Sequence, residues 1–205
     1  MTSAQIAAFT GTQVPALTTA QIAAIETADL VKMTTAQIVA LASSQMTSFT
    51  TDQIASLNSA QIQALEISDL QQLNSAQIIA LTTSQIPNLT TDQVVALTTD
   101  QIKVIETADI QRLTTAQVAS LTNTQVPALT SAQILALQSD QIAAMGPVNI
   151  TKLTGDRMTL LSASQVAALT TSQIQGLTNA EITKMSTAQV QELTTAQMPA
   201  FTQSQ

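Results

Sequence analysis

Thr18-Thr19-Ala20-Gln21-Ile22-Ala23-Ala24-Ile25 is one copy of an eight-residue phrase that fills the 205-residue chain. The phrase recurs without an insertion or a deletion, so the phase of Gln5 still holds at Gln205. A slip of one residue would break this phase, and every octad must therefore occupy an equivalent place in the fold. Unbroken short repeats of this kind are typical of solenoids. The sequence thus predicts a single continuous octapeptide-repeat solenoid over residues 1–205.

Two apolar columns run through the octads. When the first Thr of the phrase is position one, position five forms an Ile column from Ile6 to Met198, and position eight forms a Leu column from Phe9 to Phe201. Both columns contain only aliphatic residues, Met and Phe, and their spacing of three places them on one helix face. One long helix is excluded, because an apolar stripe of period eight would rotate by roughly 80° per octad around an α-helix. The chain must therefore change direction once in every octad.

The polar half of the octad has the form of a capping box. Thr18 would accept from the backbone N–H of Gln21, and the side chain of Gln21 would accept from the N–H of Thr18. Two further features agree with a helix that starts at this box. Several Asp residues lie at the second helical position, where a helix favours negative charge, and Pro147 lies at the first. We therefore expect one very short capped helix per octad. Further boxes are Thr34 with Gln37, Thr90 with Gln93, Thr114 with Gln117 and Thr194 with Gln197, and the Asp residues are Asp52, Asp92, Asp100 and Asp140.

Four prolines follow the Ile column directly, at Pro15, Pro87, Pro127 and Pro199. A proline there would break an ordinary α-helix, so we expect these segments to be barely one turn long or partly 3₁₀. The alternative is a parallel β-solenoid, in which Gln-Ile-Ala-Ala-Leu is a strand and Thr-Thr a corner. Ala and Gln are poor strand formers, whereas isolated six-residue helices are marginal in water. Propensity favours the all-α solenoid of the two.

A second period of forty residues overlies the octads. In three octads five apart an acidic pair replaces Thr and Gln, and the fourth such octad has Gly146 and Asn149 instead. Lys32, Arg112 and Lys152 each lie three residues after the Asp or Asn position. Either a forty-residue module was duplicated, or about five octads complete one superhelical turn and the acidic residues align along one edge. We expect each pair to be a capping variant, with Glu and Asp in place of Thr and Gln, rather than a metal site. The pairs are Glu26 with Asp29, Glu66 with Asp69 and Glu106 with Asp109.

Composition excludes several functional classes. The 6 basic and 13 acidic residues give a net charge of -7, which argues against nucleic acids and anionic membranes as partners. The chain has neither Cys nor His, so thiolate sites and the commonest general base are missing. We expect no catalytic, cofactor-binding or metal site, no cofactor and no enzymatic activity. No apolar run is long enough for membrane insertion, and residues 1–9 lack the pattern of a signal peptide.

Two resemblances follow from these residues. Residues 89–97, Leu-Thr-Thr-Asp-Gln-Val-Val-Ala-Leu, resemble the first helix of a TAL-effector repeat, and this resemblance supports Thr90 as a cap. It does not imply DNA binding, because the base-reading loop and the basic charge of those repeats are absent. The wider phrase, as in residues 17–24, resembles octapeptide arrays of the Leu-Thr-Thr-Ala-Gln-Ile-Ala-Ala type in large bacterial proteins. Many of those proteins are secreted or surface-associated. This second resemblance covers essentially the whole chain and transfers no site residues.

The ends of the array suggest a role. Phe9 and Leu17 open the core columns and Met198 and Phe201 close them, without a distinct polar capping repeat. We therefore expect either a longer array or a homo-oligomer formed by head-to-tail stacking, a contact that produces filaments. The predicted function is that of a structural repeat protein, a subunit of a self-assembling extracellular filament or a segment of a cell-surface stalk. The alternative is a binding module that presents a regular Thr/Gln/Ala face to ice, a glycan or a protein partner.

Overall fold

The computed structural model describes residues 2–153 and 155–205, and within them it is an all-α solenoid of short helices. The helical prediction is confirmed. The β-solenoid alternative is wrong, because the described residues contain no strand. The chain divides into two compact units, unit 1 with residues Met1–Ile105 and unit 2 with residues Glu106–Gln205.

Unit 1 consists of short α-helices with two 3₁₀ helices, which carry the label η. Their bounds are α1 Ser3–Ala7, η1 Val14–Ala16, α2 Thr19–Ala23, α3 Thr27–Leu30, α4 Thr35–Val39, α5 Ser43–Met46, α6 Thr51–Ser56, α7 Ser59–Ala64, α8 Ile67–Gln72, α9 Ser75–Ile79, η2 Ile86–Asn88, α10 Thr91–Ala96 and α11 Thr99–Val104.

Unit 2 continues the pattern with one short helix in each octad. The bounds are α12 Thr107–Ile110, α13 Thr115–Ser120, η3 Val126–Ala128, α14 Ser131–Ala136, α15 Ser139–Ala144, α16 Pro147–Ile150, η4 Gly155–Leu160, α17 Ala163–Ala167, α18 Thr171–Gly176, α19 Asn179–Ile182, α20 Thr187–Gln191 and η5 Met198–Ala200.

Each helix ends because two consecutive residues leave the helical conformation. After α10, Leu97 has φ −57° and ψ 133°, and Thr98 has φ −69° and ψ 159°. Both residues are extended, so the chain changes direction before Thr98 caps α11. Leu57 with Asn58 and Leu89 with Thr90 have similar angles, so the chain changes direction at the same place in these octads.

The two apolar columns form the core, as the sequence predicts. Members of the Ile column from Ile6 to Ile174 are no more than 2% exposed, and members of the Leu column from Ile25 to Leu177 no more than 6%. Burial of an aliphatic side chain of this size stabilises the folded state by about 1.5–3 kcal/mol. The columns therefore supply most of the favourable free energy, with one residue of each column from every octad.

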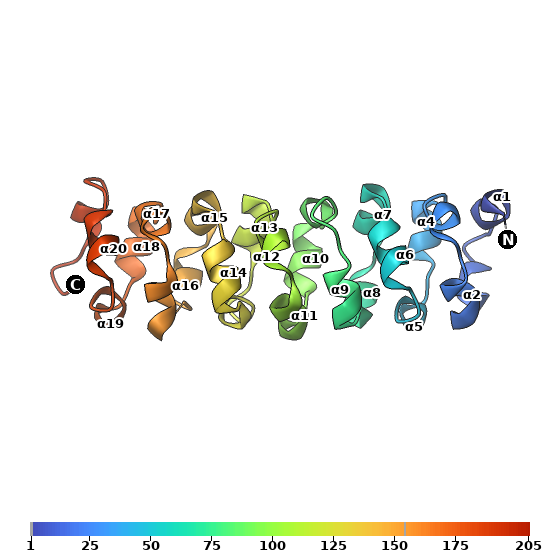
Figure 1. Cartoon of the computed structure of the whole chain (residues 1–205), viewed down its shortest axis with the longest axis horizontal. Helices are drawn as coiled ribbons and strands as arrows, with labels where there is room; N and C mark the ends of the chain where they lie inside the picture. The colour runs from blue at the N-terminus through green and yellow to red at the C-terminus, as the bar shows by residue number, and fades with distance from the viewer. Residues whose placement is uncertain (1, 154) are drawn as a thin grey trace. The chain divides into compact units, whose positions relative to one another are not determined.

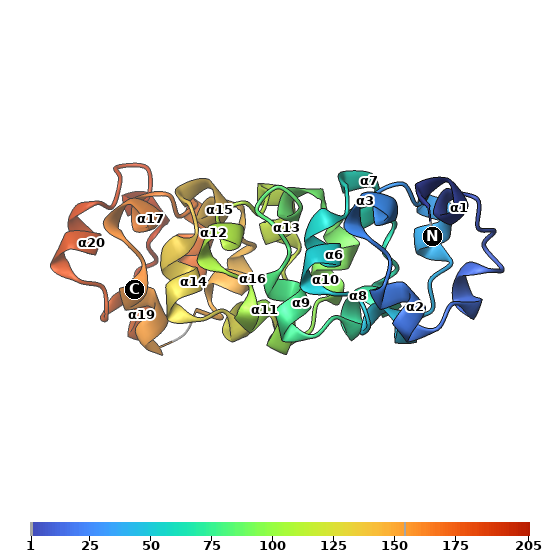
Figure 2. The same ribbon diagram turned by 45° about the vertical axis from the view of Figure 1, so that its right-hand side comes forward.

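One turn of the coil comprises between three and four octads, so the prediction of about five is wrong. Helices three octads apart pack together, as α4 does with α7 and α5 with α8 (Figure 1). In unit 2 the same relation joins α12 to α14 and α17 to α20 (Figure 2). Hydrogen bonds join residues 28 and 31 positions apart. The acidic octads are five apart and therefore do not occupy equivalent places on successive turns. The prediction that their acidic residues align along one edge is wrong as well.

The octads with proline after the Ile column adopt 3₁₀ geometry, as predicted. Pro15, Pro87, Pro127 and Pro199 each lie at the centre of a three-residue 3₁₀ helix. In η3 the N–H of Leu129 donates to the carbonyl of Val126 at 3.2 Å, which maintains the turn although proline has no N–H. Leu89 and Leu129 stay buried in two of these octads, whereas Leu17 and Phe201 in the other two are half-buried, so proline shortens the helix without opening the core in the interior of the array.

Candidate functional site

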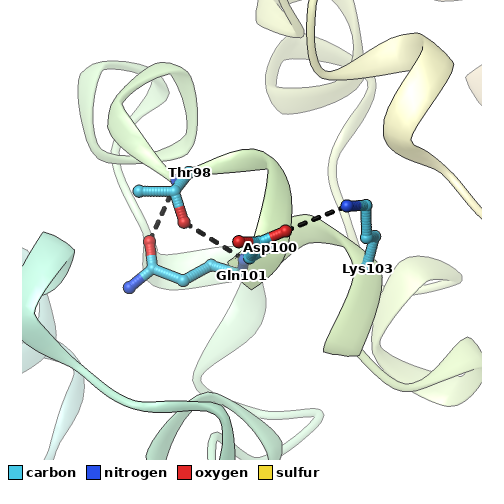
Figure 3. A network of polar contacts seen from close by, with 4 residues as sticks. All are labelled: Thr98, Asp100, Gln101 and Lys103. Carbon is cyan, nitrogen blue, oxygen red and sulfur yellow. Dashed lines mark hydrogen bonds and ion pairs between the residues drawn. The ribbon is translucent and has the colours of Figure 1, made fainter.

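The main polar feature of the molecule is a row of buried glutamine side chains at octad position four. Gln101 is an example in unit 1. Its Oε1 accepts from the backbone N–H of Thr98 at 3.0 Å, and its own backbone N–H donates to Oγ1 of Thr98 at 3.2 Å (Figure 3). These two bonds are the predicted capping box, and they satisfy two of the N–H groups that the start of a helix leaves unpaired.

The other end of the same amide reaches the previous turn of the coil. Figure 3 shows the side-chain nitrogen of Gln101 pointing away from Thr98. This nitrogen donates to the carbonyl oxygens of Leu70 at 2.8 Å and of Leu73 at 3.0 Å. Carbonyls at the end of a helix have no partner within it. One glutamine therefore caps the start of its own helix and the end of a helix four octads earlier.

We call this repeating arrangement the glutamine ladder: each position-four glutamine whose Oε1 accepts from the backbone N–H three residues earlier and whose Nε2 donates to the two carbonyls 31 and 28 residues earlier. Both amide hydrogens are used, and the orientation of the amide is fixed because N–H groups can meet only Oε1 and carbonyls only Nε2. In unit 1 the ladder includes Gln37, Gln45, Gln53, Gln61, Gln77, Gln85, Gln93 and Gln101. In unit 2 it includes Gln141, Gln165, Gln173, Gln189, Gln197 and Gln205.

All five capping boxes predicted from the sequence are present. The long-range half of each rung is not among the features predicted from the sequence. A signal for it exists, because a capping box accepts Glu or Gln equally, yet this chain places Gln in the column almost throughout. Only an amide can donate to two carbonyls while it accepts from an N–H. The absence of Glu from most of the column is therefore the mark of the second contact.

Glu181 shows what a carboxylate does in this column. Its Oε2 accepts from the N–H of Thr178 at 2.7 Å, so the capping half of the rung remains. Its Oε1 is buried and has no hydrogen-bond partner. A buried oxygen without a donor costs free energy, which explains why glutamate is rare at position four.

The acidic pairs are not capping variants, contrary to the prediction. Glu26, Glu66 and Glu106 occupy the N-cap position, but their side chains make no cap hydrogen bond. Asp29 instead accepts from the hydroxyl of Ser3, which lies on another turn. The aspartate at position four thus faces the neighbouring turn, as the glutamines do, but with a carboxylate.

Two of these aspartates are buried with unpaired oxygens. Asp69 is 1% exposed and Asp109 is 2% exposed; both oxygens of Asp69 and Oδ1 of Asp109 have no hydrogen-bond partner. Burial raises the pKa of Asp69; the Ser43 hydroxyl, which faces this carboxyl group without hydrogen-bond geometry, opposes the rise, and the charge of Glu66 adds to it. Burial also raises the pKa of Asp109 to about 6, with a further contribution from the charge of Glu106. These carboxyl groups are weak points of the core.

Other surface features of the described residues offer little chemistry. An open depression of about 500 Å³ in unit 1 is bordered by residues 63–68 together with Thr90, Asp92 and Gln93. In residues 2–153 and 155–205, no group of three or more His, Cys, Asp or Glu side chains could hold a metal ion. Asp100 and Lys103 form an ion pair at 2.9 Å on the surface, where such pairs stabilise little. Across the same residues, no helix combines the length and apolarity needed to cross a membrane.

Comparison with known proteins identifies the repeat. A family model described as the ALTTAQ repeat matches residues 22–59, 62–99 and 102–139, which together make up more than half of the chain. Successive matches begin forty residues apart, in agreement with the second period seen in the sequence. No curated protein matches the chain.

Proposed function

The chain belongs to the ALTTAQ-repeat family, and from this premise we propose that it is a structural protein: a subunit of a self-assembling extracellular filament, or a segment of a cell-surface stalk. The single observation that carries this proposal is the glutamine ladder. Each rung joins one turn of the coil to the turn before it, so the ladder holds the axial spacing of each unit constant. A repeat that specifies spacing, and whose described residues form no metal-ligating cluster, suits mechanical extension better than catalysis.

The surface chemistry agrees with a structural role outside the cytoplasm. Charge is low, with 9% charged residues, and the outer octad positions carry mostly Thr, Ser, Ala and Gln. The absence of Cys makes the fold independent of redox conditions. Extracellular octapeptide arrays of similar phrase provide the precedent for this location.

A binding module is the second candidate, and a specific observation favours it. Octad positions two, three and six are exposed in successive octads, as Thr91, Asp92 and Val95 are in α10. Side chains at these positions repeat with the pitch of the coil and could present a regular surface to ice, a glycan or a protein. Thermal hysteresis and glycan-array binding would detect the first two of these partners.

The deciding experiment is negative-stain electron microscopy of the purified chain, with sedimentation velocity over a wide concentration range. We expect end-to-end polymers whose mass grows with concentration. A strictly monodisperse monomer at the highest concentration would overturn self-assembly. Thermal hysteresis or glycan binding by that monomer would then establish the binding module instead.

A further inference from the structure

The ladder leaves unpaired donors on the N-terminal face of unit 1. Gln5, Gln13 and Gln21 each complete a capping contact, because Oε1 accepts from the N–H of Thr2, Thr10 and Thr18 at 2.8–2.9 Å. Their side-chain nitrogens make no hydrogen bond in the described structure. These three glutamines are exposed, whereas the ladder glutamines from Gln37 to Gln197 are buried.

The C-terminal face of unit 2 has the opposite character. The backbone carbonyls of Met185, Leu193 and Phe201 accept no hydrogen bond among the described residues, although each equivalent carbonyl in a complete rung accepts from a glutamine. The core is open here as well. Val190 and Met198 are 50% and 56% exposed, while the Ile column up to Ile174 is buried.

The numbers of donors and acceptors on these two faces agree. Gln205 already occupies the carbonyls of Ile174 and Leu177, at 3.0 and 2.5 Å. Among the described residues, no glutamine donates to the carbonyls of the three octads beyond them, which are the pairs Ile182 with Met185, Val190 with Leu193 and Met198 with Phe201. Three glutamines at the N-terminal face have no carbonyls. Any octads added at either end would present the same two faces, because every glutamine reaches toward lower residue numbers.

We infer that these faces bind each other between two copies of the chain, with Gln5, Gln13 and Gln21 of one copy donating to the three carbonyl pairs of the next that no glutamine reaches. The inference rests on the proposed self-assembly and adds its polarity. A contact between two donor faces would place N–H groups against N–H groups, and a contact between two acceptor faces would place carbonyls against carbonyls. In either case the polar groups would stay unpaired. Only the head-to-tail contact pairs every group and also covers Val190 and Met198.

The first test replaces the donors. In the triple variant Gln5→Glu, Gln13→Glu and Gln21→Glu, the side chains can still cap, as Glu181 does, but cannot donate. The matched control is Ala4→Asp, Thr12→Asp and Ala20→Asp, which adds three charges at octad position three, where the chain itself carries Asp52 and Asp92. We expect the association constant from sedimentation velocity to fall at least about tenfold in the glutamate variant and to change little in the control. Circular dichroism verifies that both variants fold.

The second test determines polarity by mixing. Met198→Asp, at an exposed edge, blocks the acceptor face and leaves the donor face intact, whereas the glutamate variant has the reverse defect. We expect each variant alone to be monomeric and a 1:1 mixture to form a dimer that does not grow further. Homodimers of either variant, or no dimer in the mixture, would overturn the inference.

The outcomes for the inference and for the proposed function are distinguishable. If the unmodified chain does not polymerise, self-assembly itself fails. If it polymerises and the glutamate variant polymerises equally well, the filament remains and the donor–acceptor contact alone is wrong.

Discussion

The side-chain nitrogen of Gln173 lies 2.6 Å from the carbonyl oxygen of Met145 and 2.8 Å from that of Ile142, 28 and 31 residues earlier. The same side chain accepts from the N–H of Thr170 at 2.8 Å. A single buried amide thus links helix α18 to the octad of α15. Because the rung contains a local half and a long-range half, substitutions can remove one half and leave the other.

Gln173→Glu should remove only the long-range half. The carboxylate can still accept from Thr170, but its second oxygen would face the carbonyls of Met145 and Ile142 with no donor. Such a buried charge should cost roughly 2–4 kcal/mol at neutral pH. The measurement is the urea midpoint at pH 7 and at pH 4, where protonation should recover part of the loss.

The control for that substitution lies two residues away. Gln175 is exposed and its side chain makes no hydrogen bond, so Gln175→Glu adds the same charge outside the ladder. Its stability should stay within about 0.5 kcal/mol of the unmodified chain. Equal effects at residues 173 and 175 would show that the ladder contributes nothing.

Thr170→Ala should remove one of the two local bonds, because it deletes the hydroxyl that accepts from the N–H of Gln173 at 3.2 Å, whereas the backbone N–H of residue 170 can still donate to the Gln173 side chain. Loss of an N-cap of this type costs about 1 kcal/mol. The neighbouring Thr171 is exposed and is the first residue of α18, so Thr171→Ala should leave stability unchanged or raise it slightly. Thermal or urea unfolding of the two variants compares them directly, and an equal loss in both would contradict the capping role.

Stability should fall as pH rises through the titration of the buried aspartates. The pKa of Asp109 is raised from 3.8 to about 6, so the folded state binds the proton more tightly than the unfolded state. Its contribution is therefore complete below pH 3.8 and is lost as the pH rises through about 6. Asp109→Asn should remove this dependence, because the amide stays neutral. Urea midpoints between pH 4 and pH 8 measure it, and a flat profile for the unmodified chain would contradict the burial effect.

The local features of this fold follow from the sequence. Thr18 and Gln21 are three residues apart, so their box depends only on one helical turn, and the Ile and Leu columns follow from the spacing of apolar residues. The prolines are equally local, because Pro127 removes one N–H and restricts the turn in which it lies. These elements could be predicted since each involves residues within a single octad.

The number of octads per turn could not be predicted in this way. It depends on the small rotation at each junction, such as that at Leu97 and Thr98, accumulated over several octads. The forty-residue period reflects the repetition of a module and has no fixed relation to the geometric turn. The partners of Gln37, which are the carbonyls of Ile6 and Phe9, appear only when that rotation is known. For the same reason the sequence alone predicts a capping role for Asp29, although its partner is Ser3 on another turn.

The column assignment has its own direct test, in Ile102→Asp. Ile102 is 1% exposed in the core, so the carboxylate would be buried among aliphatic side chains without a partner. The substitution should lower the free energy of unfolding by at least about 4 kcal/mol. The octads around residue 102 should unfold first, because each turn depends on its neighbours. Ala119 follows the Ile column and is exposed, and Ala119→Asp should therefore cost less than about 0.5 kcal/mol. Unfolding curves followed by circular dichroism separate the two variants. If they unfold at the same denaturant concentration, burial of the Ile column cannot be what stabilises the solenoid.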